Sequence, residues 1–485
     1  MNAGTLAQQF PWTAVHGSLD REITGCVSDS RHVDPGDLFL CFVGERSDGH
    51  AFVSEALARG AAGIVAQREI ELPEGVPFYL CPDVRRMAGH LASSIYGNPS
   101  SHLKLIGVTG TSGKTTTTYF LREALVACGK QVQLLGSLNP TSEFPSFTTP
   151  EAPALQKRLG QFVRQGTEYV VLEVSSHAIH FDRVNGSTFT AAVLTNLYRD
   201  HLELHGTEEE YARTKLSFLL SLQGKGPVAL NKDFPGSAEF VEACRGFAHT
   251  YSLLGPADVR GYVQAAGPEI SELSIRAGDS SWPARIHLPG QVNCANAVAA
   301  FTILYVLGLD PLALVEGLSK LETMNGRYWQ RQAPWGARII VDYAHTPVAL
   351  DRILDFARSQ AQQVILVFGA VGAGDRGKRP QMGGLAAEKA DRVFLTTDDP
   401  RGEDPQIILA EVEAGLIEKG RHRGIEYEVI ADRREAIKAA LAESRRGDWV
   451  VIAGRGHERV QRFGEDTWVM LNDAEEVEAY LQRWK

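Results

Sequence analysis

The middle of the chain contains an apolar run that leads straight into a glycine-rich loop, LKLIGVTGTSGKTT at residues 103–116. The apolar residues 103–108 predict a buried strand, and the apolar spacing after the loop predicts a helix. Glycines between a strand and a helix let backbone N–H groups face phosphate oxygens, and the helix N-terminus adds positive potential. We therefore expect Lys114 to reach the β- and γ-phosphates of a nucleotide and Thr115 to bind Mg²⁺.

This loop is a variant of the usual phosphate-binding motif, because the strict spacing requires glycine where the chain has Val108. A glycine-rich turn with a surface lysine is the alternative interpretation. The order of strand, loop and helix favours phosphate binding. The loop residues expected to contact the nucleotide are Gly110, Thr111, Ser112, Gly113, Lys114, Thr115 and Thr116.

Apolar runs that end in polar, unusual residues recur along the chain. They lie at residues 103–108, 169–174, 191–197, 338–343, 363–369, 392–397 and 449–454. Continuous apolar strands with helices between them are typical of parallel α/β sheets covered on both faces. Ligands of such open sheets bind outside the carboxyl ends of the strands. We therefore expect the chemistry to lie at strand ends, in a cleft between the middle and last parts of the chain.

Turn-rich segments divide the chain of 485 residues into three parts. One lies near residues 96–101, and the other is Met324-Asn325-Gly326. We predict α/β domains at residues 1–102, 103–328 and 329–485, each long enough to bury its own core.

Composition and charge exclude several classes of protein. The net charge is −10, so the chain has no bulk electrostatic reason to bind nucleic acid or an anionic membrane. The six cysteines are scattered without a Cys-x-x-Cys pair, which favours reduced thiols over a disulfide or zinc framework. We find neither a signal-peptide pattern nor an apolar stretch of about 20 residues. We expect a soluble, cytoplasmic protein without membrane insertion, a monomer that binds small molecules.

Glu173 lies at the end of the apolar run at 169–174, and His201 follows the run at 191–197; both are candidate metal ligands. A carboxylate and an imidazole near a triphosphate suit a Mg²⁺ site. The pairs His177 with His180 and His201 with His205 leave zinc open as an alternative. The sequence places no acidic residue or cysteine as a convincing further zinc ligand, and a phosphate loop needs no zinc, so Mg²⁺ is favoured.

Three further charged residues stand in suggestive contexts. Lys215 lies on a helix predicted to begin near Thr207, where a Thr-x-x-Glu pattern indicates a cap. Taken alone, it is interpreted as a solvated helix lysine. Arg401, in Asp-Asp-Pro-Arg, is able to bind a carboxylate with two hydrogen bonds, although such a turn usually carries a solvated arginine. Glu458, in Gly-Arg-Gly-His-Glu, is able to accept hydrogen bonds from an ammonium group.

Taken together, these motifs resemble the Mur ligase family over nearly the whole chain. The matching segments are Asp29–Arg31, Thr148–Pro150, Glu173–His177, Thr195–Leu197, Asp200–Leu202 and Asp342–His345. The resemblance implies a UDP-sugar-binding N-terminal α/β domain, a central P-loop ATPase-like domain with a mostly parallel sheet, and a Rossmann-like C-terminal domain that binds an amino acid. It also implies an ATP- and Mg²⁺-dependent ligase of cell wall biogenesis, which extends UDP-muramyl-dipeptide by the third residue of the peptidoglycan stem through an acyl phosphate.

The resemblance implies roles for individual residues. Glu173 and His201 would bind Mg²⁺, and Lys215 would be carbamylated and hold a second Mg²⁺. Catalysis is expected from Lys114, Lys215 and His201, mainly by positioning and charge neutralisation. The residues implied to contact UDP-muramyl-dipeptide are Ser30, Thr148, Thr149, Ser175 and Arg183. Those implied on the nucleotide side are Asn293, Asn296, Arg327 and Asp342.

The amino-acid pocket departs from the family pattern. Family members that add diaminopimelate usually carry Asp-Asn-Pro-Arg, and here Asp399 replaces the asparagine. An expected arginine is replaced by Gly374, and Arg376 could substitute in a different register. The residues expected to hold the amino acid are Asp399, Arg401, Gly454, Glu458 and Arg376. Keeping Arg401 favours diaminopimelate, because discarding a charged hydrogen bond costs roughly 1.5–3 kcal/mol. The negative charge of Asp399 favours an ammonium group, so lysine and ornithine stay open as alternatives.

Other classes of protein share a phosphate loop. A P-loop kinase or motor would be expected to show a strand ending in a metal-binding aspartate, which we do not find. Another ligase of the superfamily, such as folylpolyglutamate synthase, would not carry Asp-Asp-Pro-Arg together with Gly-x-Gly-His-Glu. A nucleotide-binding scaffold without activity need not retain Glu173, His201 and Lys215.

Overall fold

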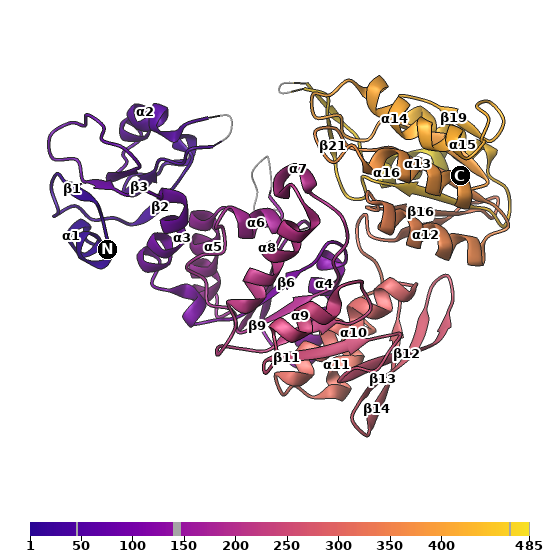
Figure 1. The fold of residues 1–485 in the computed structure, drawn as a ribbon, viewed down its shortest axis with the longest axis horizontal. Helices are drawn as coiled ribbons and strands as arrows, with labels where there is room; N and C mark the ends of the chain where they lie inside the picture. The colour runs from indigo at the N-terminus through magenta and orange to yellow at the C-terminus, as the bar shows by residue number, and fades with distance from the viewer. Residues whose placement is uncertain (45–46, 139–146, 465–466, 485) are drawn as a thin grey trace.

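The computed structural model describes residues 1–44, 47–138, 147–464 and 467–484. Within these residues, three larger sheets follow one another along the chain. Figure 1 shows the N-terminal and C-terminal parts at opposite ends of the molecule, with the central part between them. No helix of the described residues is apolar over a length sufficient to cross a bilayer.

The N-terminal part is a five-stranded sheet in the order β1-β5-β4-β3-β2. Its strands are β1 (Ala14–His16), β2 (Gly25–Val27), β3 (Asp37–Leu40), β4 (Gly63–Ala66) and β5 (Phe78–Leu80). All pairings are parallel except β1 with β5. Helices α1 (Ala3–Gln9) and α3 (Val84–Ile95) cover one face, and α2 (Val53–Ala58) covers the other.

The central sheet has nine strands in the order β14-β13-β12-β11-β10-β9-β6-β8-β7. The strands from β7 to β12 pair in parallel, and β13 and β14 continue the sheet antiparallel. The strands are β6 (Lys104–Thr109), β7 (Val132–Leu135), β8 (Tyr169–Glu173), β9 (Ala191–Leu194), β10 (Val228–Asn231), β11 (Ala248–Ser252), β12 (Val259–Ala266), β13 (Ser271–Ala277) and β14 (Ser280–Ile286).

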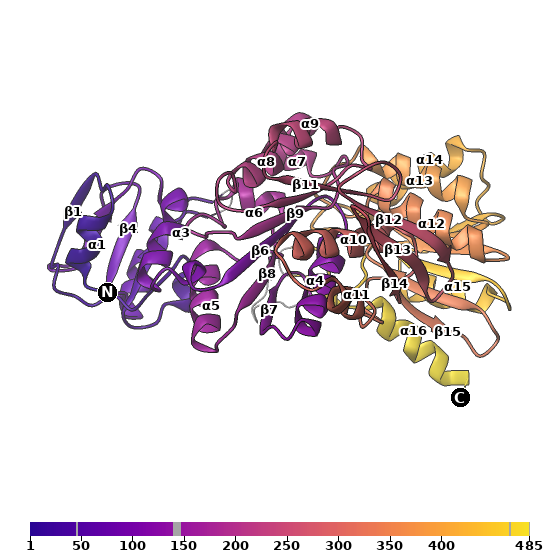
Figure 2. The ribbon, with the colours of Figure 1, turned by 90° about the horizontal axis from the view of Figure 1, so that it is seen from below.

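Both faces of the central sheet are buried. Helices α4 (Lys114–Ala127), α10 (Gln291–Val306) and α11 (Pro311–Leu318) pack on one face. Helices α5 (Ala152–Arg164), α8 (Glu208–Leu220) and α9 (Ser237–Ala243) pack on the other, and Figure 2 shows the two layers. Successive residues of β6 alternate between these cores, since Leu105 belongs to one and Ile106 to the other. This alternation explains why the strand is apolar at nearly every position.

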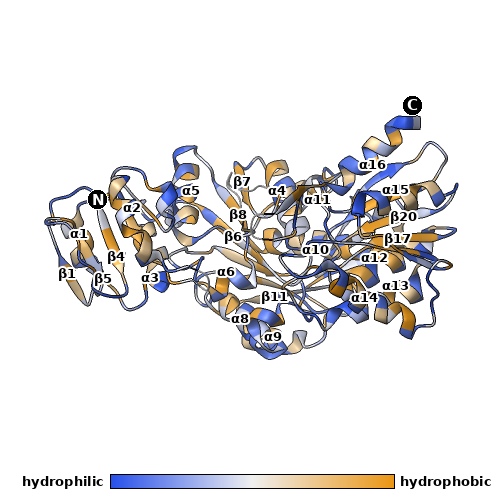
Figure 3. Ribbon diagram, turned by 90° about the horizontal axis from the view of Figure 1, so that it is seen from above, coloured by the Kyte–Doolittle hydropathy of each residue, from blue (hydrophilic) through white to orange (hydrophobic). Residues whose placement is uncertain are grey.

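The C-terminal part is a six-stranded sheet in the order β15-β16-β20-β17-β18-β19, parallel except for β15. Its strands are β15 (Trp329–Gln332), β16 (Arg338–Asp342), β17 (Val364–Phe368), β18 (Arg392–Leu395), β19 (Tyr427–Val429) and β20 (Trp449–Ala453). Helices α12 (Pro347–Gln360), α13 (Lys378–Lys389) and α14 (Pro405–Glu418) cover one face, and α15 (Arg433–Glu443) and α16 (Asp473–Leu481) cover the other. A ribbon of β21 (Val460–Arg462) and β22 (Trp468–Met470) follows β20. Figure 3 shows apolar residues concentrated on the strands of this sheet.

The predicted α/β class and mostly parallel central sheet are confirmed. Each sheet falls inside one of the three predicted segments, whose exact ends stay a prediction. Every predicted apolar run contains a strand, but several strands end early. The run at 191–197 ends as a strand at Leu194, because Thr195 and Asn196 turn away to hydrogen-bond the phosphate loop.

Candidate active site

A cavity of about 1130 Å³ lies between the central and C-terminal parts. Its lining residues follow the carboxyl ends of β6, β8 and β9 in the central sheet and of β16, β18 and β20 in the C-terminal sheet. The structure thus places the polar segments after these strands in one space, as the sequence predicts for open parallel sheets.

The phosphate loop is held rigidly against the end of β9. The Ser112 N–H donates to Asn196 Oδ1 at 3.0 Å, and Thr195 Oγ1 donates to the Ser112 carbonyl at 2.6 Å. Gly113 has φ +85°, and a Cβ there would lie 2.4 Å from Asn296 Oδ1. Only glycine satisfies both the left-handed backbone and the close approach.

Lys114 begins α4 and folds back over its own loop. Its Nζ donates to the carbonyls of Gly110 and Thr111, each at 2.9 Å. Burial lowers the pKa of its ammonium below the usual value, although the carboxylates of Glu173 and Asp200 oppose this shift. Lys114 is therefore a partly dehydrated cation placed where phosphate oxygens would sit.

Thr115 and Glu173 present two oxygen ligands side by side. Thr115 Oγ1 donates to Glu173 Oε2 at 3.0 Å, and Glu173 Oε1 accepts from the Ser137 N–H at 2.9 Å. Glu173 is only 1% exposed. Adjacent ligands of an octahedral Mg²⁺ ion, each at about 2.1 Å from it, lie about 3 Å apart. The spacing and hardness of these two oxygens therefore fit Mg²⁺.

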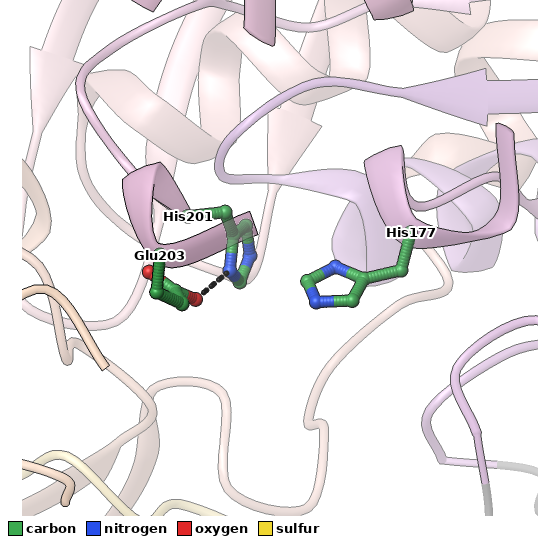
Figure 4. Close-up of side chains that lie close together, drawn as sticks. All are labelled: His177, His201 and Glu203. Carbon is green, nitrogen blue, oxygen red and sulfur yellow. Dashed lines mark hydrogen bonds and ion pairs between the residues drawn. The ribbon is translucent and has the colours of Figure 1, made fainter. Parts of the chain in front are cut away.

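His177, His201 and Glu203 form a second cluster (Figure 4), in which the candidate ligand atoms lie within 4.8 Å of one another. Glu203 Oε1 accepts from His201 Nδ1 at 3.2 Å. Burial and the nearby charge of His201 lower the pKa of His177 to about 4, so its ring is neutral at pH 7. The sequence-based inference that no acidic residue joins these histidines was wrong, because Glu203 does. A hydrogen bond at Nδ1 leaves His201 Nε2, which lies 3.4 Å from Asp200 Oδ2, as the atom for a metal ion.

Lys215 is buried, which contradicts the interpretation of its position as a solvated helix lysine. The helix itself is confirmed, since α8 begins after Thr207, whose side chain accepts from the Glu210 N–H. Lys215 is 1% exposed, and its Nζ donates to the Gly110 carbonyl at 3.0 Å. Burial, and then the charge of Lys114, lower its pKa well below the usual value. Its ammonium form is therefore disfavoured, and the side chain lies directly behind the phosphate loop.

Several contacts join the two parts across the cavity. Arg327 Nη2 donates to Thr115 Oγ1 at 3.4 Å, and its guanidinium lies 4.2 Å from the centre of the Tyr343 ring. Lys378 Nζ lies 4.0 Å from Asp200 Oδ1, and both side chains are buried. Burial tends to raise the pKa of Asp200, but His201, Lys378 and other cations lower it to about 2. The sequence pointed to the segments that contain Asp200 and Lys378, but neither residue was among the predicted site residues.

The end of the cavity where the amino acid is expected to bind contains both acidic and basic side chains. Glu458 Oε1 accepts from the Tyr343 hydroxyl at 3.2 Å, and Arg455 lies 3.5 Å from Glu458 Oε2. Burial raises the pKa of Glu458 to about 7. Gly454 has φ +114°, and a Cβ there would meet Asp398 Oδ2 at 2.2 Å, so this turn requires glycine.

Two residues expected in this pocket do not line it. Asp399 is 1% exposed and lies behind Arg401, whose Nε donates to its Oδ2 at 2.9 Å. Arg376 turns to α14, where its guanidinium forms an ion pair with Glu411, and its side chain is 62% exposed. Gly374 does line the cavity, but Arg376 does not take its place there.

The remaining predicted residues also fall into those that line the cavity and those that do not. Those that line the cavity are Thr111, Ser112, Gly113, Lys114, Thr115, Thr116, Thr148, Glu173, Ser175, Arg183, His201, Asn293, Asn296, Arg327, Asp342, Arg401, Gly454 and Glu458. Gly110, Thr149 and Lys215 lie directly behind this lining. Ser30 lies in the N-terminal part, where its hydroxyl donates to Glu55 at 2.8 Å.

Three family models match the chain. They are "Mur ligase family, catalytic domain" at residues 22–96, "Mur ligase middle domain" at 108–304 and "Mur ligase, glutamate ligase domain" at 326–456.

Curated relatives match over nearly their whole length. A UDP-N-acetylmuramoyl-L-alanyl-D-glutamate–2,6-diaminopimelate ligase of Syntrophomonas wolfei is 36% identical over 478 residues, covering 97% of this chain and 96% of the relative. A ligase of the same name from Synechococcus elongatus is 39% identical over 500 residues, covering 99% of each chain.

Solved structures are similar as well. One is also named for this ligase, with a TM-score of 0.67 and 30% identity, and it covers 100% of this chain and 99% of its own. The MurF ligase of Thermotoga maritima in complex with ADP shares the fold, with a TM-score of 0.70, 21% identity, and coverage of 95% of this chain and 98% of its own.

Proposed function

Because the chain belongs to the Mur ligase family, we propose that it catalyses the ATP-dependent joining of meso-diaminopimelate to UDP-N-acetylmuramoyl-L-alanyl-D-glutamate in peptidoglycan precursor synthesis. The names of the relatives support both the acceptor and the amino acid. The observation that carries the proposal is the cavity, which combines a phosphate loop with Arg401 and Glu458 in one space. Lysine or ornithine as the added amino acid is the alternative.

The first half of the reaction activates the D-glutamyl carboxylate. A carboxylate oxygen bonds to the γ-phosphorus of ATP while the bond to ADP breaks, which leaves an acyl phosphate. Lys114 offsets negative charge on the transferring group, and the rigid loop presents its N–H groups to the phosphates. Thr115 and Glu173 would hold Mg²⁺, which supplies further charge neutralisation when bound.

The second half joins the amino acid. Its amine attacks the acyl carbon, and the tetrahedral intermediate expels phosphate to leave an amide. The protein contributes mainly by holding the two reactants together. Glu458 and Arg401 would hold the ammonium and carboxylate groups of the non-reacting end.

The walls of the cavity offer contacts for the two larger substrates. Arg183 is held by Glu151 at 3.0 Å, with its guanidinium 4.0 Å from the centre of the Phe147 ring. We assign Thr148, Thr149, Ser175, Arg183 and, in the N-terminal part, Ser30 to the UDP-muramyl-dipeptide. We assign Asn293, Asn296, Arg327 and Asp342 to the ATP side.

Lys215 would act as a carbamate. A neutral amine attacks CO₂ to form an N–C bond and releases one proton, which converts the side chain into an anion. Its lowered pKa supports this reaction, because an ammonium group has no lone pair to donate. The Lys114 charge disfavours the ammonium form of Lys215, whereas it would attract the carbamate anion. The carbamate would also provide oxygen ligands for a second Mg²⁺.

The choice of amino acid is a direct test of the proposed function. We expect ATP-dependent phosphate release with UDP-N-acetylmuramoyl-L-alanyl-D-glutamate to be at least about tenfold more efficient, as kcat/KM, with meso-diaminopimelate than with L-lysine or L-ornithine. The reason is that losing a charged hydrogen bond to the second carboxylate costs roughly 1.5–3 kcal/mol. Preference for lysine or ornithine would overturn the assigned amino acid. Phosphate release without any amino acid would favour an NTPase instead, and phosphoryl transfer to an acceptor without phosphate release would favour a kinase.

The pH dependence of amino-acid binding follows from Glu458. Its pKa is raised to about 7, so it is mostly a neutral acid at pH 6 and mostly a carboxylate at pH 8. We expect the KM for diaminopimelate to fall about tenfold between these pH values, as the ionised fraction rises by that factor. Glu458→Gln should show a high KM that does not change with pH. A pH-independent KM in the unaltered protein would exclude Glu458 as the ammonium partner.

A further inference from the structure

Two arginines converge on the single buried carboxylate of Asp399. Arg401 Nε donates to Asp399 Oδ2 at 2.9 Å, and Arg462 Nε lies 3.6 Å from the same oxygen. The side chain of Asp399 is 1% exposed, whereas those of Arg401 and Arg462 are 38% and 40% exposed. Both arginines line the cavity, and Asp399 does not.

The charges of this trio do not balance. Two guanidinium groups and one carboxylate leave a net charge of +1, and Asp399 is the only carboxylate of the described residues that lies within 4.0 Å of either guanidinium. Two guanidinium groups that both approach one carboxylate repel each other unless an anion lies between them. Asp399 allows the two arginines to stand together but neutralises only one of them, so the remaining charge favours an anion in the cavity.

The backbone around the trio is fixed before any ligand arrives. The Arg401 N–H donates to the Arg462 carbonyl at 2.7 Å, and the Arg462 N–H donates to Asp399 Oδ1 at 2.7 Å. Arg401 has φ +53°, a left-handed conformation that a residue other than glycine keeps only when its surroundings hold it. Gln461 lies on β21 beside Arg462, and its Nε2 donates to the Asp398 carbonyl at 2.6 Å. Such preorganisation reduces the entropy cost of binding a ligand.

The other arginines near this end of the cavity are committed elsewhere. Arg376 pairs with Glu411, and Arg459 Nη2 lies 2.9 Å from Glu475 on α16. Arg455 is fully buried beside Asp398 and Glu458. Arg462, which shares Asp399 with Arg401 and lines the cavity, is therefore placed to assist Arg401 in holding an anion.

We propose that Arg462, together with Arg401, binds the carboxylate at the non-reacting end of the incoming diamino acid. The inference rests on the proposed function and names a specificity-determining residue of that site. Asp399 positions the two arginines instead of touching the substrate. Glu458 next to this pair receives the ammonium group of the same end, so one zwitterionic end meets complementary charges.

The test compares Arg462→Gln with Arg459→Gln, a matched loss of one arginine on the neighbouring rim. Binding of meso-diaminopimelate is measured by calorimetry on the enzyme saturated with UDP-N-acetylmuramoyl-L-alanyl-D-glutamate and a non-hydrolysable ATP analogue, and turnover is measured separately. We expect Arg462→Gln to raise both the Kd and the KM for diaminopimelate about 10- to 150-fold, because this is the effect of losing one charged hydrogen bond. Arg459→Gln should change them less than about threefold. The KM values for the other two substrates should stay constant in both variants.

Two further observations separate binding from a structural role. Arg462→Lys keeps the charge but loses the planar fork, so it should recover part of the affinity. The preference for diaminopimelate over L-lysine, as a ratio of kcat/KM, should fall in Arg462→Gln, because lysine lacks the second carboxylate. Unchanged Kd and preference in Arg462→Gln would overturn the assignment of Arg462. Tight binding of diaminopimelate by the unaltered enzyme without phosphate release would instead refute the proposed function. The Kd values of the unaltered enzyme and of Arg462→Gln for diaminopimelate would still decide the role of Arg462.

Discussion

Lys215→Ala is expected to lower kcat by about 10²- to 10³-fold while the protein stays folded. The carbamate proposed for this residue would be lost, and with it an anion behind the phosphate loop. Removing one group that stabilises charge in a closed active site typically has an effect of this size. Stability should suffer little, because the variant removes a buried amine whose pKa is already lowered by burial. The measurement is ATP-dependent phosphate release with all substrates, together with thermal unfolding.

Chemical rescue distinguishes the carbamate from an ordinary buried lysine. A small carboxylate such as formate or acetate fits the space that alanine leaves and restores an anion there, so we expect partial recovery of kcat. Lys225→Ala, an exposed lysine of the same domain, is the control and should keep full activity. Full activity of Lys215→Ala without additives would eliminate the carbamate. Low activity that no carboxylate improves would reduce Lys215 to a structural role.

Local sequence patterns predicted those strands and helix ends that are determined by residues close together in the chain. Leu105 and Ile106 alternate between two cores, so the strand at 104–109 could be recognised from its continuous apolar run. The Thr-x-x-Glu cap at Thr207 likewise located the start of α8. The antiparallel hairpin of β13 and β14 was not predicted, although it extends the central sheet.

The site was predictable where a motif is local and was missed where the backbone redirects a side chain. Glu203 joins His201 because His201 has φ +55° and α7 (Leu202–His205) turns back immediately after it. A left-handed residue of this type cannot be inferred from composition or spacing. Arg376 points to Glu411 although its sequence position suggests the pocket. Asp399 is covered by its near neighbour Arg401 and by Arg462, which comes from the separate β21–β22 ribbon. These outcomes depend on contacts between segments far apart in the chain.

Lys114→Met is expected to lower kcat at least about 10³-fold, with a smaller effect on diaminopimelate binding. Lys114 is a cation at the proposed phosphate position, since its Nζ donates to the carbonyls of Gly110 and Thr111 in the loop. Phosphoryl transfer depends on positioning and charge neutralisation more than on covalent chemistry, so one buried cation has a large effect. Methionine keeps much of the side-chain volume without the charge, which avoids an empty cavity.

The measurement for Lys114→Met is a single turnover that follows ADP and phosphate together, so that a slow first step is separated from slow product release. Lys320→Met, an exposed lysine paired with Glu316 in the same domain, is the control and should react like the unaltered protein. The melting temperature without nucleotide should stay within a few degrees, because methionine removes a dehydrated charge as well as two hydrogen bonds. If Lys114→Met formed ADP within tenfold of the normal rate, the loop would bind the nucleotide without Lys114 contributing to phosphoryl transfer. The proposed acyl-phosphate step would then need a different cation, and Arg327, which donates to Thr115 Oγ1 from the segment just before β15, is a candidate.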